Sequence, residues 1–303
     1  MQEKEAIILD GKATAAQIRL ELAEKVKQRT ALGKRAPGLA VILVGEDPAS
    51  QVYVRNKERA CAEVGIASHA FRLGADTSQQ ALENLIGDLN KQKNIDGILL
   101  QLPLPKGLDS QACLAAISPE KDVDGFHPMN MGRLAVGLPG LRPCTPAGVM
   151  ELLARYNLSP AGKEAVVVGR SNIVGKPLAL LLAEPGAHAN ATVTICHSGT
   201  QDLEAVCKRA DFLFLAMGRP KCIGANMVKP GAVVVDVGIN RTECGLCGDS
   251  DFEQVKKIAK AITPVPGGVG PMTIAMLLAN TLKALEAREG LLLKINLGEG
   301  NFG

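Results

Sequence analysis

Short runs of apolar and β-branched residues recur along this chain, and each ends near a glycine, a proline or a polar residue. Two of them, "LAVILVG" (39–45) and "GILLQLPLP" (97–105), are apolar almost throughout. Such runs are typical of strands that are covered on both faces, because a half-exposed strand alternates between apolar and polar residues. Helical apolar spacing is found before and between these runs, at 13–32, 49–64 and 77–92. A further strand is expected at 67–73, between the second and third of these helices. This alternation predicts an α/β fold in which a parallel sheet has helices on both faces.

The second half of the chain repeats the pattern. A helix is expected at 143–156, followed by strands at 165–169, 192–196, 211–216 and 232–237. A proline- and glycine-rich stretch, "TPVPGGVGPMT" (263–273), then leads into an amphipathic helix at 273–288. With 303 residues, the chain is long enough for two cores. We therefore predict a first α/β domain over 1–144, a Rossmann-like parallel-sheet domain over 145–272, a last helix (273–288) that returns to the first domain, and a loose tail at 290–303.

Composition excludes several classes of function. The net charge is +3, no basic run is present and aromatic residues make up 3%, so we expect no nucleic-acid partner. No apolar run approaches the roughly 20 residues that a membrane helix needs, and the first residues lack the features of a secretory signal. Of eight cysteines, only Cys244 and Cys247 are close together, without a second pair at metal-ligand spacing. We expect a cytoplasmic protein with reduced thiols, no metal and no membrane partner.

The segment "VVVGRSNIVGKP" (166–177) has the outline of a phosphate-binding turn but matches neither common template. A Walker loop has four residues between its glycines and a hydroxyl after the lysine, whereas here five intervene and Pro177 follows. The fingerprint G-x-G-x-x-G is not matched at this turn either, where Arg170 follows Gly169. A helix that begins near Gly175 would still direct free N–H groups at a pyrophosphate. Many turns from a strand through a glycine to a helix bind nothing, so this segment alone leaves the question open.

The end of the next predicted strand, at 192–196, indicates which dinucleotide this turn would bind. In NAD enzymes this strand commonly ends in an acidic residue that binds the ribose 2′-hydroxyl. Here "VTICHSGT" ends with His197 and Ser198, and the first carboxylate is Asp202. A guanidinium from Arg170 together with hydroxyl groups suits a 2′-phosphate, which favours NADP over NAD. The alternative is a surface arginine that pairs with a helix end or a carboxylate.

The first half carries polar residues in apolar surroundings. Tyr53 and Lys57 are four residues apart and share a helical face, on which Lys57 lies at the edge of an apolar stripe. Gln101 interrupts an apolar strand near its carboxyl end, where parallel sheets bind ligands. Asp122 and Asp124 precede Gly125, so at least one carboxylate should face a cleft. The alternatives are a lysine that extends its ammonium group to water and an aspartate that caps a turn.

These segments together resemble the bifunctional methylenetetrahydrofolate dehydrogenase/methenyltetrahydrofolate cyclohydrolase family. The matching pieces run in family order from about residue 7 to 288, and "KDVDG" and the proline–glycine loop are the most specific of them. The others are "YVRNKERACAEVGI", "GILLQLPLP", "PCTPAGVMELL", "VVVGRSNIVGKP", "TVTICHS" and "KPGAVVVDVGIN". Two segments depart from the pattern, a longer connection at 181–194 and the cysteine pair within 240–252.

The resemblance implies two reactions on one-carbon derivatives of tetrahydrofolate. NADP-dependent oxidation of the 5,10-methylene compound gives the 5,10-methenyl cation, and hydrolysis then gives 10-formyltetrahydrofolate. It implies that Lys57 is the main catalytic residue, that Tyr53 and Gln101 position it, and that Asp124 binds the pterin. It also implies a homodimer, folate contacts from Pro264, Gly268 and Pro271, and cofactor contacts from Gly169, Arg170, Ser171, His197, Ser198 and Ile239.

Two competing functions remain at this point. An NADP-dependent dehydrogenase of a small hydroxy acid, with Lys57 as its acid or base, would not need Asp124 to bind a pterin. A non-catalytic dinucleotide-binding regulator would bind NADP without turning over a substrate.

Overall fold

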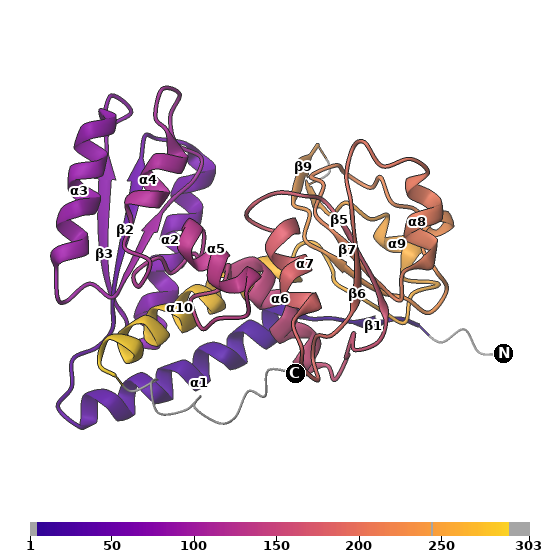
Figure 1. Cartoon of the computed structure of the whole chain (residues 1–303), viewed down its shortest axis with the longest axis horizontal. Coiled ribbons are helices and arrows are strands. Elements are labelled where there is room, and N and C mark those ends of the chain that lie inside the picture. The colour runs from indigo at the N-terminus through magenta and orange to yellow at the C-terminus, as the bar shows by residue number, and fades with distance from the viewer. Residues whose placement is uncertain (1–4, 244, 291–303) are drawn as a thin grey trace. The chain divides into compact units, whose positions relative to one another are not determined.

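The computed structural model describes residues 5–243 and 245–290 of the chain, which form two compact units (Figure 1). Among the described residues, one unit contains 19–133, 139–142 and 277–290, and we call it the three-stranded unit. The other contains 5–18, 134–138, 143–243 and 245–276, and we call it the six-stranded unit. The tail expected at 290–303 lies, from 291 on, outside the described residues.

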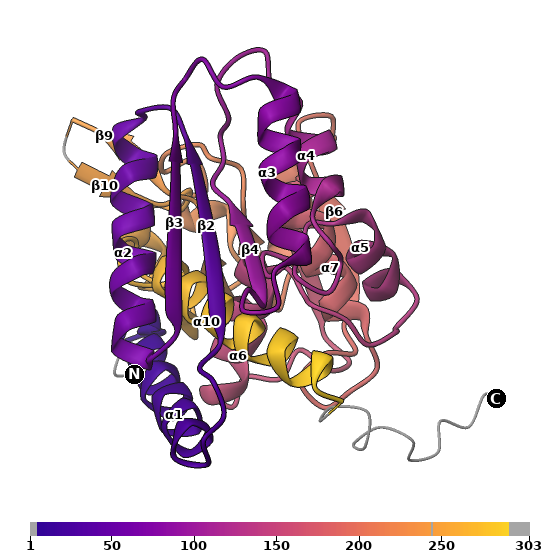
Figure 2. The same cartoon turned by 90° about the vertical axis from the view of Figure 1, so that its left-hand side faces the viewer.

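The three-stranded unit is built on a parallel sheet with the strand order β3-β2-β4 (Figure 2). Its strands are β2 (Gly38–Val44), β3 (Ala67–Leu73) and β4 (Gly97–Leu100), and its connecting helices are α2 (Pro48–Val64), α3 (Gln79–Lys91) and α4 (Ser110–Ala116). All residues of β2 and β4 are buried, as their continuous apolar runs predict. From β2 the chain passes through α2 to β3 on one side, and then through α3 across β2 to β4 on the other side. Because both connections are right-handed and run in opposite directions, they place α2 and α3 on opposite faces of the sheet.

The core of this unit explains the position of α3. Ala40, Ile42 and Val44, on one face of β2, pack with apolar residues of α3 and α4 in one buried cluster. The strand order reverses beside β2, between β3 on one side and β4 on the other. In open parallel sheets, ligands bind outside the carboxyl ends of the strands at such a reversal. The sheet therefore offers its binding position where β2 and β4 end.

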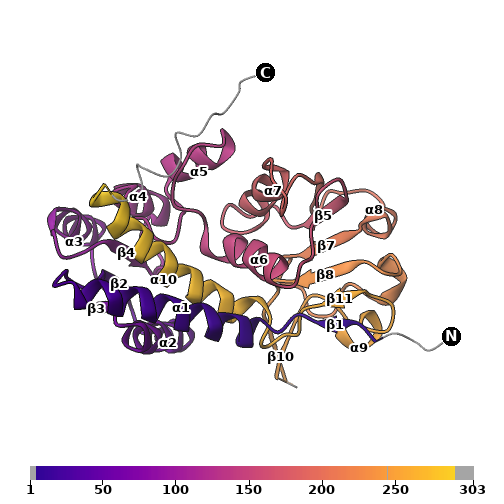
Figure 3. The ribbon, with the colours of Figure 1, turned by 90° about the horizontal axis from the view of Figure 1, so that it is seen from below.

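The six-stranded unit contains a second parallel sheet, with the order β1-β11-β8-β7-β5-β6, and Figure 3 shows β5, β7, β8, β11 and β1 in succession. Its strands are β1 (Ile7–Ile8), β5 (Glu164–Val168), β6 (Thr192–Cys196), β7 (Phe212–Leu215), β8 (Val233–Asp236) and β11 (Ala261–Ile262). Its helices include α6 (Cys144–Arg155), α7 (Gly175–Ala183), α8 (Leu203–Arg209) and the short α9 (Phe252–Val255). Here too the order reverses beside the first strand of the repeat, β5.

Further elements complete the chain. The hairpin of β9 (Asn240–Thr242) and β10 (Gly245–Cys247) belongs to the six-stranded unit, and α5 (Pro128–Ala135) follows the turn that contains Asp124. Helix α1 (Gly11–Ala31) and helix α10 (Val269–Arg288) each contribute residues to both units. From Leu277 on, α10 belongs to the three-stranded unit, where Asn280 Nδ2 donates to the Val123 carbonyl (2.8 Å). The predicted return of the last helix is confirmed.

Three differences from the predicted elements have local causes. The run 97–105 forms a strand only to Leu100, because the prolines that follow cannot donate to a sheet. Helix α10 begins at Val269 rather than 273, because Pro271 lies in its first turn, where a missing N–H costs nothing. Strand β1 was not predicted, since two residues carry no periodic signal.

A buried carboxylate fastens the three-stranded unit. Asp96 is fully buried, and its oxygens accept hydrogen bonds from the Arg35 guanidinium (2.6 and 2.7 Å) and from Arg288 Nη1 (2.8 Å). The Gly38 N–H, at the start of β2, donates to the same carboxylate (2.9 Å). The Asp96 carboxylate in turn raises the pKa of Arg35. One side chain therefore joins the start of β2, the approach to β4 and the end of α10.

We predict that Asp96→Ala lowers the free energy of unfolding by about 3–5 kcal/mol, because it leaves two guanidinium groups without their buried partner. Equilibrium unfolding in urea measures the loss. Asp88→Ala is the control, because Asp88 forms an exposed ion pair with Lys91, a type worth less than about 1 kcal/mol. Equal losses in the two variants would contradict the structural role of Asp96.

Candidate functional site

Lys57 and Gln101 meet at the carboxyl end of the three-stranded sheet. Gln101 follows β4 directly, and its Oε1 accepts a hydrogen bond from Lys57 Nζ (3.0 Å). Its Nε2 donates to the Leu102 carbonyl (2.7 Å). Since an ammonium group can only donate, these two contacts fix the amide so that its oxygen faces the lysine. Both side chains are half-buried, so the amine is held in place while remaining accessible.

Helix α2 presents Lys57 in this position. The helix starts at Pro48 after the cap Asp47, whose carboxylate accepts from the Ser50 N–H (2.7 Å), and it ends at Gly65 in the left-handed conformation (φ 82°). Val54, Cys61 and Val64 form its buried face. Burial raises the pKa of the Cys61 thiol to about 12, which leaves this thiol protonated and inert. Lys57 lies at the edge of the face, as the sequence predicts.

Tyr53 stands one helical turn before Lys57 on the same helix. Its side chain is 44% exposed, an open position for so large an aromatic ring. Residues four apart on a helix lie on the same side, so the ring and the amine border the same surface of α2. The ring is accessible to a flat ligand that approaches the lysine.

The two aspartates near Gly125 have different surroundings. Asp122 is buried and pairs as an isolated parallel bridge with Ile98 of β4. Its carboxylate accepts from the N–H groups of Phe126 (3.2 Å) and His127 (2.8 Å) and from Asn130 Nδ2 (2.9 Å), and burial raises its pKa. Asp122 therefore holds the turn that leads into α5.

Asp124 itself is half-buried in the turn that begins beside β4. The isolated parallel bridge between Asp122 and Ile98 places the start of this turn beside β4, and the Gly125 N–H donates to the Asp122 carbonyl (3.0 Å) to close it. Asp124 and the Lys57–Gln101 pair belong to the same unit.

The proline–glycine loop belongs to the six-stranded unit. A Cβ at Gly268 would lie 2.5 Å from the Pro264 carbonyl oxygen, and a Cβ at Gly11 would lie 1.8 Å from the Gly268 oxygen. The Lys12 N–H, at the start of α1, donates to the Gly267 carbonyl (2.8 Å). Backbone therefore packs on backbone here, which only glycines permit. Pro264 and Pro271 are half-buried on either side of this contact.

The turn after β5 shows why its two glycines are required. Gly169 has φ +138°, and a Cβ on it would lie 2.3 Å from the Ala216 carbonyl oxygen. A Cβ on Gly175 would lie 2.1 Å from the Gly169 oxygen. The start of α7 therefore lies directly against the end of β5, beside which the strand order reverses. This is the position at which doubly wound sheets bind nucleotides.

Ser171 and Arg170 differ in their contacts within this turn. Ser171 Oγ accepts from the N–H groups of Val174 (3.1 Å) and Gly175 (3.3 Å), so two of the donors expected to face a pyrophosphate are already occupied. Arg170 is exposed, and among the described residues its guanidinium has no hydrogen bond or ion pair. The alternative of an arginine that satisfies a helix end or a carboxylate is therefore not what the structure shows.

The end of β6 also agrees with a phosphate-binding role. His197 Nδ1 accepts from the Gly199 N–H (3.1 Å), which shapes the turn, and Ser198 is exposed. The first carboxylate, Asp202, is engaged as the cap of α8 through the Ala205 N–H (3.1 Å). Ile239 follows β8 and is 47% exposed. The predicted cofactor residues thus lie at the carboxyl ends of β5, β6 and β8.

Asp249 holds the loop after β7 in place, and no sequence pattern indicated this role. It is fully buried and accepts from three consecutive N–H groups after β7, those of Met217 (2.6 Å), Gly218 (3.1 Å) and Arg219 (2.8 Å). It also accepts from Asn240 Nδ2 (2.9 Å), one residue after Ile239. Nothing in "CGDSDF" distinguishes this aspartate from a surface one, so only the fold reveals it.

The described residues contain no group of three or more His, Cys, Asp or Glu side chains arranged to hold a metal ion. In the same part of the chain, no helix is both long and apolar enough to cross a membrane. Cys244, one half of the cysteine pair, lies outside the described residues, and Cys247 is a half-buried free thiol.

Two family models match this chain, one in its first part and one in its second part. Residues 9–124 match the family model for the tetrahydrofolate dehydrogenase/cyclohydrolase catalytic domain, and residues 143–289 match the model for its NAD(P)-binding domain. The chain is 71% identical over 284 residues to the bifunctional protein FolD of Nitratidesulfovibrio vulgaris, covering 94% of this chain and 99% of the relative.

Two solved structures extend the likeness. The FolD methylenetetrahydrofolate dehydrogenase/cyclohydrolase of Campylobacter jejuni is 49% identical, with a TM-score of 0.90 over 93% of this chain and 99% of its own. The Trypanosoma brucei enzyme, solved with NADP and an inhibitor, is 39% identical, with a TM-score of 0.88 over 94% of this chain and 99% of its own.

These likenesses confirm the fold class, the two activities and the NADP cofactor expected from the motifs. They give no support to a hydroxy acid dehydrogenase or to a non-catalytic regulator. The chain belongs to the tetrahydrofolate dehydrogenase/cyclohydrolase family and is a bifunctional, NADP-dependent enzyme of one-carbon metabolism.

Proposed function

We propose that Lys57 is the catalytic residue of the hydrolytic step and that Gln101 positions it. The observation that carries this proposal is the hydrogen bond from Lys57 Nζ to Gln101 Oε1 (3.0 Å) at the point where the strand order reverses. Water adds its oxygen to the carbon of the methenyl cation, and one of its protons must leave as the new C–O bond forms. The amine of Lys57 in its neutral form accepts that proton, and the amide of Gln101 then holds the ammonium group.

Tyr53 and Asp124 bind the substrate in this proposal. The exposed ring of Tyr53 lies against a flat portion of the folate, one helical turn from the amine. The amino-pyrimidine edge of a pterin presents neighbouring N–H donors, and the carboxylate of Asp124 accepts them. Pro264, Gly268 and Pro271 contact the folate through the stiff loop that their close packing creates.

The residues of the β5–α7 turn fit NADP. Gly169 lets the turn pack directly against the Ala216 carbonyl, and Arg170 presents a guanidinium that has no partner among the described residues and suits a 2′-phosphate. Ser171, His197, Ser198 and Ile239 complete the set of cofactor contacts that we propose. Bound at this turn, NADP would supply the acceptor for the hydride that leaves the one-carbon bridge. The lone pair of a neighbouring substrate nitrogen expels the hydride, so this step needs no proton transfer by a side chain. The protein contributes by holding the nicotinamide and the one-carbon bridge in the right positions.

The assignment of functions to domains is part of the proposal. Residues 1–144 with the helix at 273–288 would bind the folate and carry the chemistry, and 145–272 would bind NADP. We also propose a homodimer and a cytoplasmic location. The location is supported by five buried cysteines, none of which forms a disulfide among the described residues. Sedimentation of the full chain tests the oligomeric state.

Lys57→Met should reduce hydrolysis of the methenyl compound by about 100-fold or more, because the positioned proton acceptor is lost. The decay of the methenyl absorbance measures this step, and NADP affinity should not change. Lys25→Met, on the exposed side of α1, is the matched control. Hydrolysis at the normal rate in Lys57→Met would remove Lys57 from the mechanism.

Arg170→Ala should weaken NADP binding by about tenfold to a hundredfold and leave NAD binding nearly unchanged, because only NADP carries the 2′-phosphate. Calorimetric titration with each cofactor gives the two affinities. Arg209→Ala removes an arginine whose partner is Glu164, and it serves as the control. Equal losses for both cofactors would refute the role in phosphate binding.

Asp124→Ala should raise the KM for folate substrates by about tenfold in both reactions, because one carboxylate binds the same ring in each step. Initial rates of oxidation and of hydrolysis provide the two KM values. The NADP affinity of this variant should match that of the unchanged protein. A KM effect on one reaction alone would show that Asp124 does not bind the shared pterin.

A further inference from the structure

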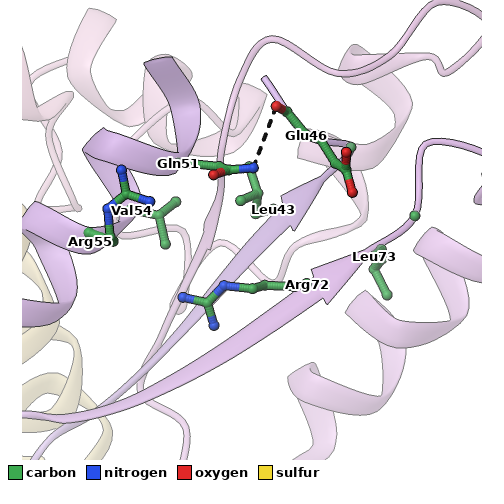
Figure 4. Close-up of a pocket in the computed structure, with 9 residues that line it drawn as sticks. Leu43, Glu46, Gln51, Val54, Arg55, Arg72 and Leu73 are labelled. Atoms are coloured by element: carbon green, nitrogen blue, oxygen red, sulfur yellow. Dashed lines mark hydrogen bonds between the residues drawn. The ribbon is translucent and has the colours of Figure 1, made fainter. Parts of the chain in front are cut away.

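A polar pocket of about 360 Å³ lies where β2 and β3 end, and Arg55 and Arg72 are among its lining residues (Figure 4). Its polar side chains are loosely held. Both arginines are exposed, and the hydrogen bond from Gln51 Nε2 to the Glu46 backbone oxygen is long (3.4 Å). None of the residues proposed to bind folate or NADP lines this pocket. A far more firmly held polar group lies in the six-stranded unit.

Two buried aspartates interlock at the carboxyl end of the six-stranded sheet. Asp236 ends β8 and is 1% exposed, and Asp249 follows the β9–β10 hairpin and is 0% exposed. Asp236 Oδ1 accepts from the Asp249 N–H (3.0 Å), and Asp236 Oδ2 accepts from the N–H (2.7 Å) and the hydroxyl (2.6 Å) of Ser250. A Cβ on Gly248 would lie 2.1 Å from Asp236 Oδ2, and a Cβ on Gly238 would lie 2.3 Å from Asp249 Oδ1. Each carboxylate is therefore fixed against a bare Cα.

Ile239 is held between these two carboxylates. The Gly238 N–H donates to Asp236 Oδ1 (3.0 Å), and Asn240 Nδ2 donates to Asp249 Oδ1 (2.9 Å). The residues before and after Ile239 are thus each tied to one carboxylate, and hydrogen bonds to charged acceptors are among the strongest in proteins. The Ile239 side chain nevertheless keeps 47% of its surface exposed. An accessible apolar side chain is therefore presented on a rigid backbone.

The same pair supports the turn after β5. Asp249 accepts from the N–H groups of residues 217–219, which directly follow Ala216. A Cβ on Gly169 would lie 2.3 Å from the Ala216 carbonyl oxygen, so the β5–α7 turn packs on the segment that Asp249 holds. Strands β5, β7 and β8 are neighbours in the sheet. One pair of carboxylates therefore fixes the spacing between the turn at Gly169 and the loop that carries Ile239.

Resting on the proposed function, we propose that Asp236 and Asp249 are positioning residues for hydride transfer. They set the position of Ile239 relative to the turn at Gly169, and thereby the placement of the nicotinamide ring of NADP. Both carboxylates are buried, so they act through the loops and not by touching the cofactor. Hydride transfer depends steeply on the alignment of the two carbons, so a looser pair slows oxidation more than it weakens cofactor binding. Hydrolysis at Lys57, in the other unit, does not need the pair.

The main test is Asp249→Asn, which keeps the size of the side chain but turns one acceptor into an N–H donor that faces other donors. The kcat of NADP-dependent oxidation should fall by about 10-fold to 100-fold. NADP affinity should fall by less than about threefold, because the contact between Arg170 and the 2′-phosphate remains. Hydrolysis of the methenyl compound should stay within about twofold of the normal rate.

Two further readouts separate positioning from a loss of folded protein. With deuterium on the one-carbon bridge, the isotope effect on oxidation should rise in Asp249→Asn, because hydride transfer then limits turnover. In the free protein, without substrate or cofactor, the amide hydrogens of residues 217–219 should exchange about tenfold faster or more. The amides of β7, which report global unfolding, should exchange as in the unchanged protein.

Asp211→Asn is the matched control. Asp211 precedes the same strand, β7, at its amino end, and its carboxylate accepts from the Glu164 N–H (3.1 Å) and from Lys229 Nζ (2.7 Å). This variant should leave the oxidation rate, the isotope effect and the exchange at 217–219 unchanged. Asn240→Ala is a milder companion, because Asp249 keeps three of its four donors. It should fold even where Asp249→Asn does not, and show the same changes at smaller size.

A proportional fall of oxidation and hydrolysis in Asp249→Asn would overturn the proposal, since a loss of folded protein affects both. Unchanged exchange at 217–219, or an equal change in isotope effect in Asp211→Asn, would also overturn it. Ile239→Ala distinguishes this proposal from the proposed function. If Ile239→Ala slows oxidation while Asp249→Asn and Asn240→Ala do not, the cofactor contact stands and the positioning role is wrong. Oxidation at the normal rate in Ile239→Ala would refute the contact itself, and the positioning role with it.

Discussion

The reversal of strand order in both parallel sheets is the constraint on which this structure depends. Right-handed connections oblige the chain to place successive helices on opposite faces when it passes from one side of a strand to the other. The helices then leave the strand ends uncovered at that point. In the three-stranded unit Lys57 of α2 meets Gln101 after β4 there, and in the six-stranded unit the Gly169 turn begins α7 there.

Buried carboxylates stabilise the loops around these positions. Asp96 joins two arginines and the start of β2, Asp122 holds the turn before α5, and Asp249 binds three consecutive N–H groups after β7. Each carboxylate is itself buried and satisfies its oxygens with backbone or guanidinium donors of the segments that it joins. In contrast, the residues proposed to bind ligands, Tyr53 and Arg170, keep exposed surface. Rigid loops thus present side chains that remain available.

Much of the site could be predicted because its residues break a local pattern. Gln101 stands out in an apolar strand, and Lys57 stands out beside a buried helical face. Arg170 stands out as a basic residue directly after the glycine that ends a predicted strand. The two aspartates before Gly125 have no such distinction from one another, and only the bridge between Asp122 and Ile98 shows which of them holds the turn. The role of Asp249 follows from a contact across some thirty residues, which no local pattern encodes.

The sequence by itself determined the α/β class, the order of strands and helices along the chain, and the family, because periodicity and motif spacing are local properties. Only the tertiary structure decided that β1 joins the six-stranded sheet and that α1 and α10 serve both units. It alone decided that Arg55 and Arg72 line one pocket. These facts depend on which segments pair and pack across long separations in the chain, and pairing is set by the whole core rather than by any short stretch of residues.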